Sequence, residues 1–282
     1  MGTNHAALRA LGLVSVLAVA ARSAHAEAPA GPCAESFLDP VITPVRAAGI
    51  DGQRTACLRD EAVVVLHTDA LIDTPGFRGV LGGELRAIGR MRLGAHAELD
   101  VAVRALRVVY VQNAVTKVTA AQFGPLMLGG AWGTSLGRTQ PVQLALAGSL
   151  ELPYTRQEVD TLHTSGDLAV LATTALTART TLHARLGLVW MYASSLGGRT
   201  ARAAPRAGVD LARRVGRHLA LQAGADVQAG WYGAGLDHVN LRAGVHARLR
   251  GAWRVMAGLG VPLGGDERMS AVFDLGVLRD LR

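Results

Sequence analysis

Lysine, aromatic side chains and long uncharged apolar runs are scarce in this sequence. Its basic residues and its apolar runs bear directly on the class of protein. Of the 29 basic residues, 28 are Arg and one is Lys117. They are spread evenly, so the net charge of +7 forms no nucleic-acid patch. No apolar run beyond the first 30 residues reaches the length of about 18 that a membrane-spanning helix needs. An apolar share of 50% excludes a disordered chain.

The first 26 residues have the organisation of a secretory signal peptide. A weakly basic start that ends at Arg9 leads into an apolar run over 10–21. Ala24 and Ala26 then supply the small residues that signal peptidase requires before its cleavage site. The apolar run is too short to cross roughly 30 Å of hydrocarbon as a helix. We therefore expect a signal peptide over 1–26 and export of the rest of the chain.

Only two cysteines are present, Cys33 and Cys57, and both follow the predicted cleavage site. In an oxidising compartment such an isolated pair favours a disulfide, and no histidine lies between them to suggest a metal site. The surrounding residues 27–60 hold four of the ten prolines and show no sustained period. We expect a short disulfide-closed segment that lies in the periplasm or folds into the interior as a plug. No metal or cofactor is predicted.

From about residue 61 onward, apolar and polar residues alternate with a period of two. Every second residue from Leu219 to Trp231 is apolar, while Gln222, Asp226 and Gln228 lie between them. Successive side chains of a strand point to opposite faces, so such a segment is a strand with one apolar and one polar face. The alternation lasts for 10 to 14 residues. Globular strands average about five or six residues, whereas a membrane-crossing strand needs about 9 to 11.

Twelve such strands can be placed, and the breaks between them alternate in length. We expect the strands at 61–69, 77–88, 91–106, 118–135, 139–152, 166–177, 181–193, 204–214, 217–231, 238–249, 252–263 and 268–280. Short breaks lie at 89–90, 137–138, 179–180, 215–216 and 250–251, and longer ones at 70–76, 107–117, 153–165, 194–203, 232–237 and 264–267. Only a closed sheet pairs every backbone group in lipid. The pattern therefore predicts an all-β fold, a 12-stranded antiparallel transmembrane β-barrel over 61–282, with both ends in the periplasm.

In this pattern the chain resembles the integral outer-membrane β-barrel proteins of Gram-negative bacteria. The resemblance covers roughly residues 61–282 and rests on strand alternation and loop lengths, not on a sequence motif. It implies a place in the cell outer membrane, contact with outer-membrane lipid and insertion by the barrel-assembly machinery. The chain departs from the family in its last residues, which are Asp280-Leu281-Arg282 in place of an aromatic end, and in its thin aromatic girdle.

The polar faces of the predicted strands would line the lumen. The candidates are Arg86, Arg92, His96, Glu98, Asp100, Arg104, Arg185, Asp226, Arg242, His246, Arg248 and Arg254. Because Arg outnumbers the carboxylates among the lumen residues, we predict a porin-like passive channel that transports small polar solutes with a weak anion preference. The rival prediction is a salt-bridge network that packs the lumen shut. That network would make the protein a closed structural or adhesive barrel, which contacts partners through its outer loops.

An outer-membrane hydrolase is the third hypothesis, and the sequence gives it little support. No HExxH zinc motif occurs, and the strand histidines fall on the predicted lumen face, away from the lipid. Asp160 and His163 share one predicted loop, as the groups of an outer-membrane protease would, but an exposed loop histidine is the simpler explanation. We therefore predict that the protein is not an enzyme and has no catalytic residues.

Overall fold

The computed structural model describes residue 33 and residues 55–73, 78–112, 117–122, 124, 126–137, 141–156, 161–195, 198–229, 236–249, 251–264 and 271–281. They form the strands β1 (Glu61–Asp73), β2 (Arg78–Leu93), β3 (Ala97–Gln112), β4 (Lys117–Gln122), β5 (Leu126–Leu136), β6 (Val142–Arg156), β7 (Thr161–Thr177), β8 (Thr180–Ser195), β9 (Gly198–Arg214), β10 (Leu219–Ala229), β11 (Leu236–Arg248), β12 (Trp253–Gly264) and β13 (Ala271–Asp280). These residues include no helix that is long and apolar enough to cross a membrane. The predicted signal peptide and most of 27–60 lie outside the described residues.

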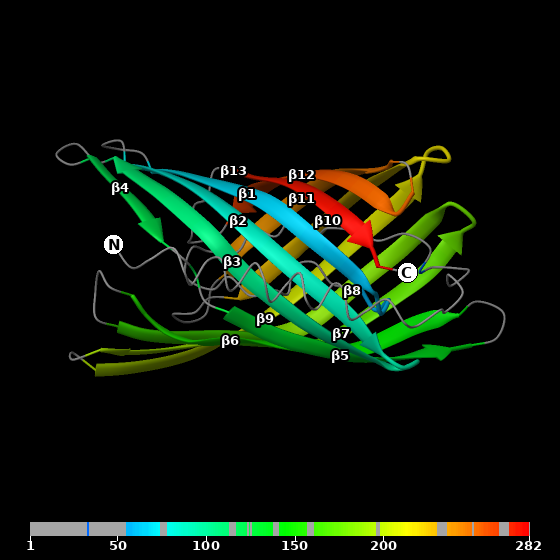
Figure 1. The fold of residues 1–282 in the computed structure, drawn as a ribbon, viewed down its shortest axis with the longest axis horizontal. Helices are drawn as coiled ribbons and strands as arrows, with labels where there is room; N and C mark the ends of the chain where they lie inside the picture. Colours follow the sequence, from blue (N-terminus) through cyan, green and yellow to red (C-terminus); the bar gives the residue numbers. More distant parts are fainter. Residues whose placement is uncertain are drawn as a thin grey trace.

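The sheet closes on itself, because β1 pairs with β13 as well as with β2, and every strand pair is antiparallel (Figure 1). Glu61 stands opposite Arg90 on one side and opposite Asp280 on the other. β4 pairs with the last residues of β3 and β5 with its first, so these two strands share one position in the wall. The wall therefore has twelve positions, and the predicted 12-stranded antiparallel barrel is confirmed.

Alternation sorts the side chains onto two faces as predicted. Along β10, Leu219 and Leu221 are exposed on the outer face, while Ala220 and Gln222 are buried inside. The same exposed and buried alternation runs along β13. Within the barrel, charged and polar side chains share the inner face with smaller apolar ones.

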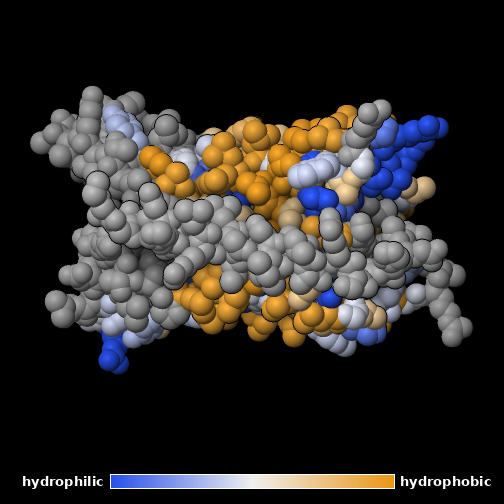
Figure 2. Space-filling view, viewed as in Figure 1, coloured by the Kyte–Doolittle hydropathy of each residue, from blue (hydrophilic) through white to orange (hydrophobic). Residues whose placement is uncertain are grey.

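The outer face carries an apolar belt. Exposed apolar side chains occur all around the wall, among them Val64, Leu146, Leu186, Leu241 and Phe273. Figure 2 shows apolar side chains gathered over the middle of the barrel, with hydrophilic patches toward its ends. A belt of this kind matches the hydrocarbon of a membrane, and the closed sheet pairs the backbone groups that lipid could not hydrogen-bond.

Tight turns lie at the end of the barrel where β1 starts and β13 ends, and such turns are typical of the periplasmic end of outer-membrane barrels. Three of them carry a glycine with positive φ, Gly94 at 79°, Gly137 at 86° and Gly251 at 68°, a backbone that L side chains rarely adopt. The predicted break at 89–90 is wrong, because β2 continues to Leu93 and the chain turns at Gly94.

At the opposite end the β6–β7 and β8–β9 hairpins are longer, and their connections shorter, than predicted. β6 continues to Arg156 and β7 starts at Thr161, both inside the loop predicted at 153–165. The β8–β9 hairpin likewise stays paired well inside the loop predicted at 194–203. An antiparallel hairpin keeps its ladder in water without an apolar face, so alternation alone underestimates where such strands end.

Candidate functional site

The inner face of the barrel carries interleaved charges of both signs. Among the described residues, the buried carboxylates are Glu61, Glu84, Glu98, Asp100, Glu151, Asp167, Asp210, Asp226 and Asp274, and the buried arginines are Arg86, Arg90, Arg104, Arg206, Arg242 and Arg254. Nine carboxylates thus stand against six arginines in this buried set. The Arg excess on which the predicted anion preference depended is absent from it.

One cluster of charges lies on β1–β3 and β13. The carboxylate of Glu84 accepts a hydrogen bond from Arg86 and forms an ion pair with Arg104, with 2.9 Å between Arg104 Nε and Glu84 Oε1. His67 Nδ1 lies 2.6 Å from Asp274 Oδ1, across the seam where β1 meets β13. All five side chains are buried, so their attraction is screened by water much less than at the surface.

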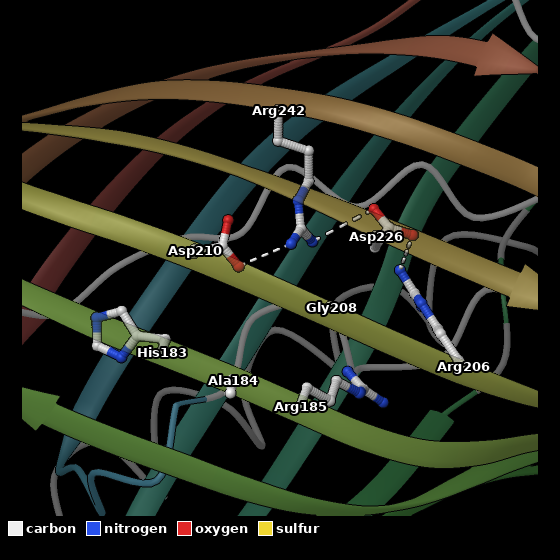
Figure 3. Close-up of a pocket in the computed structure, with 8 residues that line it drawn as sticks. All are labelled: His183, Ala184, Arg185, Arg206, Gly208, Asp210, Asp226 and Arg242. Carbon is white, nitrogen blue, oxygen red and sulfur yellow. Dashed lines mark hydrogen bonds and ion pairs between the residues drawn. The ribbon is translucent and has the colours of Figure 1, made fainter.

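A second cluster lies around Arg242 on β9–β11 (Figure 3). One guanidinium nitrogen of Arg242 donates to Asp210 Oδ2 at 2.7 Å, and the other lies 3.5 Å from Asp226 Oδ1. Arg206 donates to Oδ2 of the same Asp226 at 3.3 Å. Carboxylates and guanidinium groups therefore alternate in this cluster. The attraction between neighbouring opposite charges offsets the cost of removing each of them from water.

The second cluster leaves little open space. A cavity of about 20 Å³ lies against it, lined also by Arg185, with room for about one water molecule. Glycine makes space for the charged groups, since a Cβ on Gly224 would come within 1.9 Å of the Asp210 carboxylate. A Cβ on Gly208 would likewise come within 3.4 Å of the Arg242 guanidinium. Paired charges therefore line the inner face beside this cavity.

The residues just before β1 cross the mouth of the barrel at the end that carries the tight turns, and we call residues 55–60 the strap. The backbone N–H of Ala56 donates to Oγ1 of Thr173 on β7 at 3.2 Å, and the backbone N–H of Arg59 donates to the Glu98 carboxylate on β3. β7 is the sixth of the twelve wall positions counted from β1. The strap therefore passes from one side of the lumen to the other.

Small apolar side chains form a socket for the end of the strap. Ala56 is 3% exposed and packs with the socket residues Ala131, Ala145, Ala147, Ala169 and Leu171, which come from β5–β7. Cys57, the next residue, forms a disulfide with Cys33, and both are buried. The predicted disulfide is confirmed. Socket and disulfide together fix the strap at its far end.

The predicted lumen residues fall into three groups. Those buried on the inner face are Arg86, Glu98, Asp100, Arg104, Asp226, Arg242, His246 and Arg254. Arg92 and Arg185 are partly exposed, and Arg185 donates to Asp167 at 2.6 Å. His96 is exposed in the β2–β3 turn, which corrects its predicted place, because the predicted alternation was carried past the end of the strand. Arg248 is exposed at the last position of β11, where it has the parity of the inner residues Arg242 and His246.

One lumen pair, Glu61 with Arg90, and two further buried charges were not predicted. Arg90 donates to Glu61 at 2.5 Å, and both were taken for strand-end or turn residues. Asp167 and Arg206 are also buried. The sequence could have identified them, because each is an even number of residues away from other inner residues on its strand. Arg206, for example, lies four residues before Asp210.

Residues 133–137 read Gly-Thr-Ser-Leu-Gly and match the GxSxG motif of α/β hydrolases, a match absent from the sequence-based predictions. That motif acts at a strand-to-helix turn, whereas here it forms the end of β5 and the turn after it. Ser135 is exposed and accepts a hydrogen bond from Gln143 Nε2 at 3.0 Å. Asp160 and the side chain of His163 lie outside the described residues, within which no group of three or more His, Cys, Asp or Glu could hold a metal ion.

Comparison with known proteins places this architecture in a class. No protein-family model and no curated protein match the sequence. An outer membrane channel from Pseudomonas putida F1 matches with 13% identity and a TM-score of 0.62, over 85% of this chain and 99% of the other. The translocator domain of the autotransporter NalP from Neisseria meningitidis matches with 12% identity and a TM-score of 0.54, over 78% and 87%. The NanC porin matches with 8% identity and a TM-score of 0.51, over 77% and 99%.

These likenesses concern the fold. The chain has the fold of an outer-membrane β-barrel protein, and its place is the outer membrane. Barrels of this fold include a channel, a porin and an autotransporter translocator.

Proposed function

We propose that the protein is a channel for small polar solutes, which its own strap holds closed at the periplasmic mouth. The observation that carries the proposal is the hydrogen bond from Ala56 to Thr173, which ties a segment ahead of β1 to the far side of the lumen. The charged inner face suits hydrated solutes. Two of the similar structures are described as a channel and a porin, which supports the same class.

The strap is the part of the interior that can leave without opening the sheet. Its contacts include the hydrogen bonds of Ala56 and Arg59, the 2.6 Å bond from the Arg92 backbone N–H to Asp60, the 3.0 Å bond from the Leu281 backbone N–H to the Asp60 carbonyl, the disulfide of Cys57 and the apolar socket. A wall strand, by contrast, is held by a backbone ladder along each side. Segments with few contacts open at the lowest free energy. We therefore assign the gate to the strap and not to the wall.

Size, more than charge, would select the solutes. Pores acquire strong ion selectivity from rings of one charge sign, whereas here carboxylates and guanidinium groups are paired with one another. We therefore propose passage of small polar solutes without a strong ion preference, in place of the weak anion preference predicted from the sequence.

Planar-bilayer recording of the Ala56→Glu variant tests the gate. A carboxylate among the apolar side chains of the socket loses its hydration, and its desolvation costs more than the strap contacts supply. We expect openings about tenfold more frequent than in the unmodified protein. Ala201→Glu, at an exposed position of β9, is the matched control and should leave the openings unchanged.

Two results would overturn the proposal. If Ala56→Glu and the unmodified protein open equally often, the strap is not the gate. If both are silent in bilayers although heat-modifiable migration confirms folding, the protein is a closed structural barrel, the rival prediction from its sequence.

A further inference from the structure

A group of arginines lies outside the lumen, at the periplasmic end of the barrel. Arg179, Arg213, Arg217 and Arg279 are all exposed, and we call them the basic rim. They come from the β7–β8 turn, the end of β9, the β9–β10 connection and the end of β13. Figure 2 shows a strongly hydrophilic patch at this end, over the β9–β10 connection at the upper right. Within the described part of the chain, no guanidinium of the basic rim has an ion-pair partner.

Two members of the basic rim continue the lipid-facing rows of their strands. On β9 the outward row runs through Val209 and Leu211 to Arg213, and all three are exposed. On β13 it runs through Leu275 and Val277 to Arg279. These guanidinium groups therefore stand where the hydrocarbon ends and the headgroups begin.

An aromatic side chain marks the same level. Trp253 is 44% exposed on the outer face of β12 and stands opposite Arg279 in the strand register. The Arg279 guanidinium lies over its ring, 5.4 Å from the centroid. Tryptophan collects at membrane–water interfaces, so the pair fixes a cation at headgroup depth. Asp280, the carboxylate beside it in sequence, is occupied by Arg254 at 2.7 Å.

We propose that the basic rim binds the headgroups of anionic glycerophospholipids in the periplasmic leaflet of the outer membrane. Phosphate is the natural partner of an exposed guanidinium, which donates two parallel hydrogen bonds to it. Each basic residue near an anionic lipid surface strengthens binding by about fivefold. The rim covers the β7–β13 side of the barrel, so the lipid shell of the protein is enriched in anionic lipid on one side. This inference is independent of the channel.

The opposite side of the barrel supplies an internal control. Trp132 on β5 is 58% exposed near the same end, and the ring beside it is that of His96, 6.3 Å away between centroids. A tryptophan there reports on lipid at a similar depth, away from the basic rim. Trp132 and Trp253 can therefore be compared in one protein.

Fluorescence quenching by brominated lipid tests the inference. The full chain is reconstituted in vesicles of phosphatidylcholine and phosphatidylglycerol, with bromine on the acyl chains of one or the other. One variant keeps only Trp253 (W132F, W190F and W231F), and its counterpart keeps only Trp132. We expect phosphatidylglycerol to be preferred about fivefold or more at Trp253 in low salt, with no preference at Trp132. The preference should fall toward one in high salt.

Arg213→Gln with Arg279→Gln, in the variant that keeps only Trp253, should remove most of the preference without altering heat-modifiable migration. An equal preference at both tryptophans, or one that survives the double substitution, would overturn the inference. Gly251→Cys, labelled in intact cells with a membrane-impermeant thiol reagent, tests the leaflet. Labelling from outside would overturn the periplasmic assignment, while the quenching result would still stand or fall by itself.

Discussion

The arginines of the lumen are buried, whereas the arginines of the basic rim are exposed. Arg206 and Arg242 are buried and share the carboxylate of Asp226. Arg213 and Arg217 are exposed and have no ion-pair partner among the described residues. A buried charge depends on its partner, because removal from water costs several kcal/mol per ion, whereas an exposed one does not. The same residue type therefore stabilises the barrel in one place and is available to a ligand in the other.

The largest loss of stability is expected from a substitution of Asp226, the carboxylate that two lumen arginines share. Asp226→Asn leaves Arg206 and Arg242 buried with less opposing charge, and removing one partner of a buried ion pair costs about 3–5 kcal/mol. We expect the folded band in heat-modifiability gels to disappear at a clearly lower urea concentration. Adding Arg206→Gln removes the surplus charge and should restore much of the loss. If Asp226→Asn unfolds like the unmodified protein, the pairing does not stabilise the barrel.

A smaller effect is expected at Gly224. An alanine there would place its Cβ 1.9 Å from the Asp210 carboxylate and 2.5 Å from the carbonyl oxygen of Val209. Overpacking of this kind costs about 1–3 kcal/mol, measured as a shift in the same urea transition. Gly83→Ala, where a Cβ meets nothing within 4 Å, is the control and should cost less. If the two variants unfold at the same urea concentration, the Asp210 side chain can move aside to accommodate the added Cβ.

The smallest effect is expected at the basic rim. Arg217→Gln removes an exposed charge that has no ion-pair partner among the described residues, so stability should change by less than about 0.5 kcal/mol. The same urea titration measures it. A loss comparable to that of Asp226→Asn would show that the rim is structural, and would contradict the contrast between the two groups of arginines.

Fold class and strand number could be predicted because a membrane wall imposes a period of two on each segment. The row from Leu219 to Gln228 shows the period in the sequence and the same two faces in the structure. Strand ends could not be predicted, because the alternation continues unbroken through tight turns and into hairpins that stand in water. His96 was misplaced for that reason, and β6 was drawn four residues short of Arg156.

The candidate site was only partly predictable. Parity along a strand identifies inner residues such as Asp226 and Arg242, but it does not tell which guanidinium meets which carboxylate. That depends on the register between strands, which pairs Glu61 with Arg90. The strap left no periodic signal, since its contacts are single backbone N–H groups and one alanine in a socket. Long-range contacts of that kind appear only when the sheet has closed.

The strap resembles a tethered ligand, because Ala56 and the socket that binds it belong to the same chain. Ala56 lies five residues before the first residue of β1, so its return to the socket is intramolecular. A short tether of this kind holds a binding group at an effective concentration of about millimolar. Contacts with a dissociation constant of about the same size would leave the mouth open for about half of the time, and one more hydrogen bond would shift that balance about fivefold. In the proposed gate, single contacts such as the one at Thr173 would set the open fraction, and small changes there would tune permeability without altering the barrel.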